Sequence, residues 1–471
     1  MQSDSKNNFF LFSESSDLIA IIKSDSTFLL KDLFTKANQL SQLFAEQGIK
    51  KHNYVPLHID DQLKFIETTI ALWYLGAVPV PLNTKLLDEE IYSIIGEHDF
   101  KVLVTDKIFN DDETKRKLKL INLNKIDFYN FDFKQYQLSE LENEAVVIFT
   151  SGSTGRPKGV VHTFNSLINS IINGNEILNH KENDRWLASL PFYHIGGFQI
   201  ICRSLFYGCS IIIPDSLQTK DLADAIVNQN PTHLSFVSTQ LERLIHQKIF
   251  PNASLRVSLI GGGFVHDELM LEAEKLGWKP IRVYGSTETA SMITAISANE
   301  MRLKPQSVGK AFNKIEIIIS DDSEILIKSG SLFKNYLDDE NETSSKLVDN
   351  FYHTGDIGFV DADSYLFIEA RRNDLIVTGG ENVNPIEVEK VLLQIPHIKD
   401  VCVFPKQSKT WGQIVAAAVV RDDPSINEKD IKDVLKQKIA GYKIPKEFFF
   451  VDTLPRTALG KLERNKIKKL F

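Results

Sequence analysis

The chain has 471 residues, 43% of them hydrophobic, and a formal net charge of −8. It is therefore long enough to bury a large core and to divide into two or more domains. The acidic balance and the lack of a concentrated basic surface argue against a nucleic-acid partner, and no apolar run approaches the ~18 residues that a transmembrane helix needs.

Two further features predict a cytoplasmic protein. The apolar stretch at residues 18–22 is too short for a signal peptide. The three cysteines, Cys202, Cys209 and Cys402, have no C-x-x-C spacing and lie in apolar sequence. This pattern is typical of buried free thiols in a reducing compartment.

The first elements alternate between helix and strand. Apolar residues at helical spacing from Leu63 to Trp73 predict a helix that ends at Gly76, and Ala77–Leu82 follows with a strand pattern. Further along the chain, the apolar run Ala145–Phe149 predicts a short buried strand. This strand leads into the segment with the clearest chemical signal.

Residues 150–159 read TSGSTGRPKG and predict a phosphate-binding loop. Small hydroxyl residues alternate with glycines, so backbone amides and hydroxyls can surround a polyphosphate without obstruction from Cβ atoms, and Lys158 adds a positive charge. The loop is not a Walker A motif, because Gly159 follows Lys158 where that motif requires Ser or Thr. Composition alone also allows a Ser/Gly-rich surface linker.

The pattern continues with a strand at 210–213, a helix at 221–228 and a strand at 234–237. Such βαβ units indicate an α/β fold with mostly parallel sheets. After about residue 310 the helical signals become rare, and residues 315–319 and 324–328 predict a β-hairpin. We assign residues 1–370 to one large domain with a β-rich appendage.

Residues 371–471 are predicted to form a small, mobile α+β C-terminal domain. A helix start is marked by Asn384 as N-cap, Pro385 in the first helical position and Glu387 two residues later. Apolar residues from Ile431 to Ile439 predict another helix, which is expected to end at Gly441.

Six further segments carry concentrated signals: LPFYHIGG from Leu190, LIGGG from Leu259, YGSTE from Tyr284, YHTGD from Tyr352, ARRNDLIVTGGENVNP from Ala370 and PRTALGK ending at Lys461. One such segment is weak evidence, but the ordered set is specific. Together with the loop, it resembles the adenylate-forming superfamily of acyl-CoA synthetases, nonribosomal adenylation domains and luciferases over nearly the whole chain.

The resemblance implies an ATP site. Tyr284 is expected to stack on adenine, and Asp356 to accept hydrogen bonds from the ribose, assisted by Arg371 or by the adjacent Arg372. Glu288 is expected to hold Mg²⁺ as a metal ligand together with Thr154. The predicted nucleotide-binding residues are Thr150, Ser151, Gly152, Ser153, Thr154, Gly155, Lys158, Gly261, Gly262, Gly263, Tyr284, Gly285, Ser286, Thr287, Asp356 and Arg371.

The resemblance also implies catalytic and mobile residues. Lys461 is expected to bridge the attacking carboxylate and the α-phosphate of ATP, and Asn373 to be the hinge between the domains. Gly379, Gly380 and Glu381 match the segment that reaches the CoA thiol after the small domain has rotated. The catalytic set is completed by His194 and Glu288.

The acyl pocket is predicted around His194, with Phe192 and Ser286 as further substrate-contacting residues. The implied reaction joins a small-molecule carboxylic acid to CoA through an acyl-adenylate, with ATP and CoA as cosubstrates and Mg²⁺ as cofactor. Within the superfamily, the sequences FTSGSTGRPKGVVHTF and KTWGQIVAA most resemble the 2-succinylbenzoate-CoA ligases of menaquinone biosynthesis. Gly196 departs from them, since many of those enzymes have Ser at this position.

Three alternatives remain at this stage. The first is another aryl- or fatty-acyl-CoA synthetase, and the second is an adenylation enzyme that loads a carrier protein. The third is an inactive nucleotide-binding relative that acts as a sensor, against which Lys461 and Glu288 argue.

Overall fold

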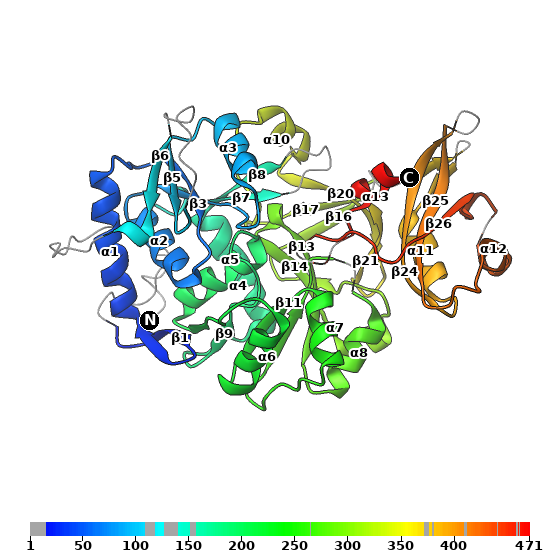
Figure 1. Cartoon of the computed structure of the whole chain (residues 1–471), viewed down its shortest axis with the longest axis horizontal. Helices are drawn as coiled ribbons and strands as arrows, with labels where there is room; N and C mark the ends of the chain where they lie inside the picture. Colours follow the sequence, from blue (N-terminus) through cyan, green and yellow to red (C-terminus); the bar gives the residue numbers. More distant parts are fainter. Residues whose placement is uncertain are drawn as a thin grey trace.

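The computed structural model describes residues 16–108, 118–126, 140–150, 157–263, 265–371, 376–378, 381–408, 412–439, 441–457, 460 and 462–471. A large N-terminal body carries most elements, and the last sheet forms a smaller C-terminal body at one end of the molecule (Figure 1). Within these ranges, no helix has the length and apolar character required to cross a membrane.

The largest sheet of the described chain has nine strands, and the pairs from β1 to β13 are parallel. Its order is β15 (Lys310–Ala311), β14 (Ser291–Ser297), β13 (Pro280–Ser286), β12 (Val257–Ile260), β11 (His233–Phe236), β9 (Arg185–Leu187), β10 (Ser210–Ile212), β1 (Ile19–Lys23) and β2 (Ser26–Leu29). Every residue of β11 and β12 is buried, as in parallel strands that are covered on both faces. The predicted α/β class is confirmed.

Helices connect and cover these strands. Figure 1 shows α6, α7 and α8 in green along one side of the large body. The helices of the large body are α1 (Leu30–Glu46), α2 (Gln62–Tyr74), α3 (Asp88–Glu97), α4 (Phe164–Leu178), α5 (Ile195–Tyr207), α6 (Thr219–Asn228), α7 (Ser238–His246), α8 (Asp267–Lys275), α9 (Ala298–Leu303) and α10 (Glu340–Lys346). The predicted helix at 63–73 is α2, which begins where the Asp61 carboxylate accepts hydrogen bonds from the first-turn amides.

Two smaller sheets complete the N-terminal part. One is parallel and has the order β4 (Val78–Pro81), β3 (Tyr54–His58), β5 (Val102–Thr105) and β6 (Lys119–Asn122). The other is antiparallel and has the order β18 (Asn335–Tyr336), β8 (Lys158–Thr163) and β7 (Glu144–Thr150). The predicted strand at 145–149 is therefore present and lies at the edge of the second sheet.

The β-rich appendage is an antiparallel sheet. It contains β16 (Glu316–Ile319), β17 (Glu324–Lys328), β20 (Phe351–Val360), β19 (Leu347–Val348) and β21 (Leu366–Arg371). Strands β16 and β17 pair directly, which confirms the predicted hairpin. The predicted domain boundary stays a prediction. Strand β21 continues through Arg371 in this sheet, and the next described residue is Ile376.

The C-terminal body is a sheet with helices packed on it. The sheet contains β23 (Glu381–Val383), β22 (Ile376–Thr378), β25 (Gly412–Arg421), β24 (Ile398–Ser408) and β26 (Glu447–Phe450). The helices are α11 (Pro385–Leu393), α12 (Glu428–Leu435) and α13 (Arg464–Leu470). Helix α11 begins as predicted, because the Asn384 side chain accepts a hydrogen bond from the Ile386 amide.

The predicted end of the helix at Gly441 is wrong. Helix α12 ends at Leu435, after which i→i+3 bonds interrupt the regular helical pattern: the amide of Gln437 donates to Val434, and that of Lys438 donates to Leu435. Gly441 instead begins a separate 3₁₀ turn, η6 (Gly441–Lys443). Apolar periodicity therefore extended beyond the helix, because Ile439 still packs against the core of the C-terminal body.

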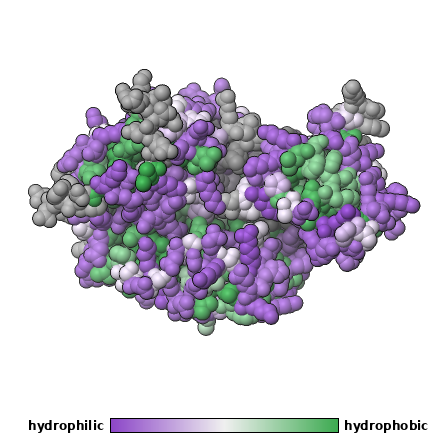
Figure 2. Space-filling view, viewed as in Figure 1, coloured by the Kyte–Doolittle hydropathy of each residue, from purple (hydrophilic) through white to green (hydrophobic). Residues whose placement is uncertain are grey.

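The surface differs between the two bodies. Figure 2 shows a mostly hydrophilic face with a hydrophobic area on the C-terminal body, at the right of the view. The sheet of this body has apolar residues on both faces: Val401 and Val403 face one core cluster, and Cys402 and Phe404 face another. Cys202, Cys209 and Cys402 are free and buried, as predicted.

Candidate active site

The predicted phosphate loop connects β7 to β8. The two strands pair antiparallel, with Thr150 opposite Lys158 at their ends. Gly159 is closely packed, because an added Cβ would lie 3.0 Å from both Leu337 Cβ and Val147 Cγ1. Five predicted loop residues lie outside the described part of the chain: Ser151, Gly152, Ser153, Thr154 and Gly155.

Lys158 and Glu288, both predicted site residues, meet around Tyr336. The Lys158 ammonium pairs with the Glu342 carboxylate and lies 5.5 Å from the centre of the Tyr336 ring. The Tyr336 hydroxyl donates a hydrogen bond of 2.9 Å to Glu288 Oε1. Burial, followed by the Glu288 charge, raises the pKa of Tyr336, so its hydroxyl keeps the proton that it donates.

Tyr336 and Glu342 lie outside the motifs that the sequence marks. Tyr336 lies 48 residues from Glu288 in the chain, and Glu342 lies 184 residues from Lys158. Neither stands at a spacing with chemical meaning. The pairing of β18 with β8 places this segment beside the strand that follows the loop.

Glu288 lies in a single 3₁₀ turn, η4 (Thr287–Thr289). The next two residues, Ala290 and Ser291, have φ values of 53° and 105°. Non-glycine residues rarely adopt such conformations, and each costs about 1–3 kcal/mol. The surrounding structure must therefore hold this turn in place.

Contacts from other segments supply this support. The Glu288 carbonyl accepts a hydrogen bond of 2.8 Å from the Phe333 amide. The Thr287 carbonyl lies 2.7 Å from Nε2 of His162, a side chain in β8 that is wholly buried. Burial lowers the pKa of His162 to about 4, so the ring is neutral at physiological pH.

The residues predicted to hold adenosine also meet. The Tyr284 hydroxyl, at the end of β13, donates a hydrogen bond of 2.7 Å to Asp356 Oδ2. Asp356 is buried in β20, directly opposite the main chain of Arg371 in β21. Two segments that are far apart in the sequence, β13 and the β20–β21 hairpin, therefore meet at this point.

The glycines of LIGGG follow β12, next to the end of β13. A Cβ on Gly261 would lie 2.8 Å from Val283 Cγ2, and Gly262 has φ of +81°. A Cβ on Gly263 would have no other atom within 4 Å in the described structure. On β13, Gly285 has no room for a side chain, because an added Cβ would lie 1.7 Å from the Ser291 carbonyl oxygen. These main chains approach each other at the carboxyl ends of parallel strands, where ligands bind in open α/β sheets.

His194 is the N-cap residue of α5. Burial lowers its pKa to about 4, and the neighbouring Tyr193 ring lies 4.6 Å from its own. Phe192 is only 4% exposed, and its ring lies 5.4 Å from that of Phe65 in α2, so it belongs to the core rather than to an open pocket. Ser286 Oγ is buried and lacks a hydrogen-bond partner among the described residues.

The small domain contributes less to the described site. Asn373, Gly379, Gly380 and Lys461 lie outside the described residues, and only the main chain of Glu381 is described. Gly460, which directly precedes Lys461, has φ of +75°, and a Cβ there would lie 2.4 Å from Thr239 Oγ1. Since Thr239 is in α7, this loop contacts the large body.

Comparisons with known proteins agree with this geometry. Residues 12–337 match the family model described as AMP-binding enzyme, and residues 387–461 match that of the AMP-binding enzyme C-terminal domain. A 2-succinylbenzoate–CoA ligase of Bacillus licheniformis is 32% identical over 464 residues, which cover 96% of each chain.

Two solved structures of Bacillus subtilis o-succinylbenzoate CoA synthetase have nearly the same fold. The complex with the acyl-adenylate intermediate OSB-AMP has a TM-score of 0.88 at 31% identity, covering 96% of this chain and 95% of that chain. The complex with ATP and magnesium ion has a TM-score of 0.87 at 30% identity, with 96% and 97% covered.

Proposed function

This chain belongs to the AMP-binding enzyme family, and we propose that it joins 2-succinylbenzoate to CoA, with ATP converted to AMP and pyrophosphate. The family resemblance predicted from the motifs is confirmed, and an AMP-forming acid–CoA ligase is the activity that its relatives carry. The observation that most supports the acid is the similarity, over nearly the full length, to ligases named for it. The product would enter menaquinone biosynthesis.

ATP would bind across the carboxyl ends of β12 and β13. The Tyr284 ring would face adenine while its hydroxyl stays on Asp356. The second carboxylate oxygen of Asp356 would then accept from the ribose. Gly261–Gly263 would allow the main chain to approach the base, and the loop at 150–158 would surround the phosphates.

The residues present fit Mg²⁺ held jointly with the nucleotide. In the described part of the chain, no three His, Cys, Asp or Glu side chains form a group that could cage a metal ion. Mg²⁺ needs no such cage, because it is usually held by one or two carboxylates together with substrate phosphates. Glu288 would supply the carboxylate, with Thr154 as the second protein ligand. The ion would neutralise phosphate charge.

The chemistry is two displacements. A carboxylate oxygen of the acid attacks the α-phosphorus, the bond to the bridging oxygen breaks, and pyrophosphate leaves. The CoA thiol then loses its proton and attacks the acyl carbon, and the bond to AMP breaks. Lys461 would stabilise the charge of the first transition state. The contact of Gly460 with Thr239 supports this role, because it brings the Lys461 loop to the large body.

The second displacement needs another arrangement. We propose that the small domain turns about Asn373, which removes Lys461 and brings Gly379, Gly380 and Glu381 to the thiol path. The acid itself would lie beside His194 and Ser286. His194, being neutral near pH 7, would donate one hydrogen bond, and the unpartnered Ser286 hydroxyl would donate another. Because Phe192 is buried, it would support the residues of the pocket wall and would not line the pocket itself.

We also place the enzyme in the cytoplasm. Its three buried cysteines are free, as expected in a reducing compartment.

The substrate is tested by kcat/KM for CoA thioester formation. 2-Succinylbenzoate should react far better than 4-phenylbutanoate or a medium-chain fatty acid, because polar groups placed for a second carboxylate are left unsatisfied by monocarboxylic acids. Equal or faster turnover of the monocarboxylic acids would disprove the assigned acid while leaving the ligase activity. Failure of CoA to react, with a carrier protein accepted instead, would disprove the assigned thiol.

A further inference from the structure

His162 contacts the turn that carries Glu288. Its Nε2 lies 2.7 Å from the Thr287 carbonyl oxygen, and its Nδ1 lies 3.0 Å from Ser166 Oγ. A carbonyl can only accept a hydrogen bond, so Nε2 carries the hydrogen of the neutral ring. Nδ1 is then an acceptor that faces the Ser166 hydroxyl. The ring is thereby fixed in one tautomer and one orientation.

This contact acts on a turn whose backbone is followed by two unfavourable conformations. Turn η4 is followed by Ala290 and Ser291 with φ of 53° and 105°. The Thr287 carbonyl has one local partner, the Ala290 amide at 3.1 Å. His162 adds a partner from another sheet, and it does so at the residue next to Glu288.

His162 also connects this turn to the loop at 150–158. Lys158 and His162 are both in β8 and four residues apart, so their side chains project from the same face of the strand. Lys158 lies over the Tyr336 ring, whose hydroxyl holds the Glu288 carboxylate. Strand β8 therefore supports Glu288 at two points: the carboxylate through Tyr336, and the main chain through His162.

We propose that His162 is a positioning residue, which holds the Glu288 carboxylate in the orientation that receives Mg²⁺ with ATP. This proposal rests on the metal-binding role assigned to Glu288 above. It adds that the strand leaving the phosphate loop sets the geometry of the metal ligand, so that the loop and the ligand keep a fixed relation.

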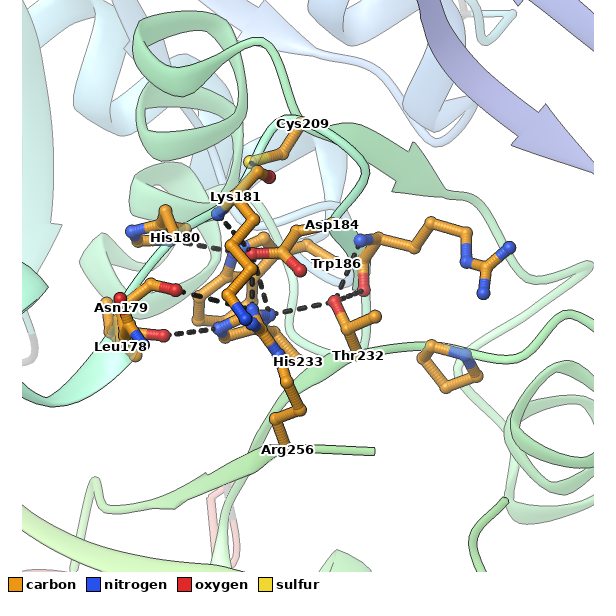
Figure 3. A network of polar contacts seen from close by, with 12 residues as sticks. Leu178, Asn179, His180, Lys181, Asp184, Trp186, Cys209, Thr232, His233 and Arg256 are labelled. Atoms are coloured by element: carbon orange, nitrogen blue, oxygen red, sulfur yellow. Dashed lines mark hydrogen bonds and ion pairs between the residues drawn. The ribbon is translucent and has the colours of Figure 1, made fainter. Parts of the chain in front are cut away.

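A matched control exists elsewhere in the chain. His233, in β11, is also wholly buried, with Nε2 3.0 Å from the Leu178 carbonyl oxygen and Nδ1 2.9 Å from Thr232 Oγ1. Figure 3 shows this ring among Asp184, Arg256 and Trp186, in a network that contains none of the predicted site residues. The two histidines make the same types of contact, but only His162 holds the Glu288 turn.

The experiment measures the free Mg²⁺ concentration that gives half of the full ATP affinity. Titration calorimetry of the whole protein with ATP, at a series of Mg²⁺ concentrations and without carboxylic acid, reports binding rather than turnover. His162→Leu should raise this concentration about ten-fold or more, as removal of residues that orient a metal ligand does. His162→Gln should stay near wild type, because its amide nitrogen can donate to the Thr287 carbonyl. His233→Leu should leave the Mg²⁺ requirement unchanged.

Two results would overturn the proposal: a wild-type Mg²⁺ requirement in a folded His162→Leu variant, or an equal increase in His233→Leu. Melting temperatures establish which variants are folded. If His162→Leu does not fold, His162→Asn replaces it, because the shorter amide reaches Ser166 but not Thr287. A wild-type requirement in that variant has the same meaning.

Glu288→Gln separates this proposal from the function on which it rests. If Glu288→Gln leaves the Mg²⁺ requirement unchanged, the metal role of Glu288 is wrong, and the positioning role falls with it. If Glu288→Gln raises the requirement and His162→Leu does not, only the positioning role is wrong.

Discussion

His162 and His233 make the same two kinds of polar contact, but the turns that they contact differ in function. Each buried ring has Nε2 near a main-chain carbonyl, at 2.7 and 3.0 Å, and Nδ1 near a hydroxyl, at 3.0 and 2.9 Å. Each carbonyl also borders a left-handed turn: Thr287 precedes Ala290 with φ of 53°, and Leu178 precedes Asn179 with φ of 47°.

The difference lies in what the turn carries. The turn at Leu178 and Asn179 ends α4 and leads into β9, so it connects two elements and carries none of the proposed site residues. The turn at Thr287 carries Glu288, whose carboxylate points to Tyr336. The same hydrogen-bonding chemistry therefore supports the scaffold in one place and the carboxylate proposed to bind Mg²⁺ in the other. Local contacts do not reveal function unless the next residue is considered.

The largest expected effect on activity is the loss of adenylation in Glu288→Gln. The substitution keeps the shape of the side chain but removes the anionic oxygen that a hard cation prefers. We expect ATP/pyrophosphate exchange with 2-succinylbenzoate to fall about 100-fold or more, which corresponds to about 2.7 kcal/mol of transition-state stabilisation. The melting temperature should change little. Wild-type exchange across a Mg²⁺ titration would remove Glu288 from the metal site.

A substitution in the network around His233 should lower stability and leave ATP binding unchanged. The Asp184 carboxylate is 4% exposed, pairs with Arg256 and accepts a hydrogen bond of 2.7 Å from the Lys181 amide. Asp184→Ala leaves both donors without this partner, and we expect it to cost about 3 kcal/mol of unfolding free energy.

The measurement for Asp184→Ala is urea unfolding together with ATP affinity at saturating Mg²⁺. The folded fraction should bind ATP as the wild type does, since the network contains none of the proposed site residues. A specific loss of ATP affinity without loss of stability would contradict this separation between scaffold and site.

Tyr336→Phe tests the other support of Glu288. It removes the hydroxyl that donates to Glu288 Oε1 and keeps the ring under Lys158. Hydrogen bonds to charged groups contribute about 1.5–3 kcal/mol, so we expect the Mg²⁺ requirement for ATP binding to rise about ten-fold. Tyr352→Phe is the control, because Tyr352 is also buried and packs against Phe333 on the same side of the molecule. Equal effects of the two substitutions would indicate general packing.

The order of elements could be predicted from the sequence because periodicity and turn residues act locally. The strand at 145–149, the hairpin at 315–328 and the Asn384 cap are examples. The end of α12 could not be predicted, since the chain loosens into i→i+3 bonds after Leu435, while Ile439 keeps the apolar pattern and its amide still donates to the Leu435 carbonyl.

The sequence marks candidate site residues where they belong to a motif, and it gives no signal where only the topology brings residues together. Tyr284 and Asp356 belong to recognisable segments, and the Tyr284 hydroxyl lies 2.7 Å from Asp356 Oδ2. Tyr336 and His162 act through contacts between distant strands. A lone histidine in the apolar run VVHT looks like an ordinary core residue. Its carbonyl partner is 125 residues away, so no local pattern indicates it.

The smallest expected effect is a shared response to acid. Burial lowers the pKa of His162 to about 4 from 6.5, and it shifts His233 in the same direction. Between these pH values the unfolded chain binds a proton that the folded chain does not. Each histidine therefore adds stability that is fully present above pH 6.5 and is lost as the pH falls toward 4.

Replacing either ring with Gln removes the titrating group and should flatten the decline. We expect the loss of unfolding free energy between pH 7 and about 5.5 to shrink by about 1 kcal/mol in His162→Gln, and by a similar amount in His233→Gln. The exposed His246 is the control, and His246→Gln should leave the decline unchanged. Urea unfolding at several pH values measures all three. Since acid titration depends on burial and not on what the turn carries, the two histidines should behave alike here, although they differ in Mg²⁺ dependence. An undiminished decline in His162→Gln would mean that this ring is protonated in the folded protein, and then both of its nitrogens would be donors.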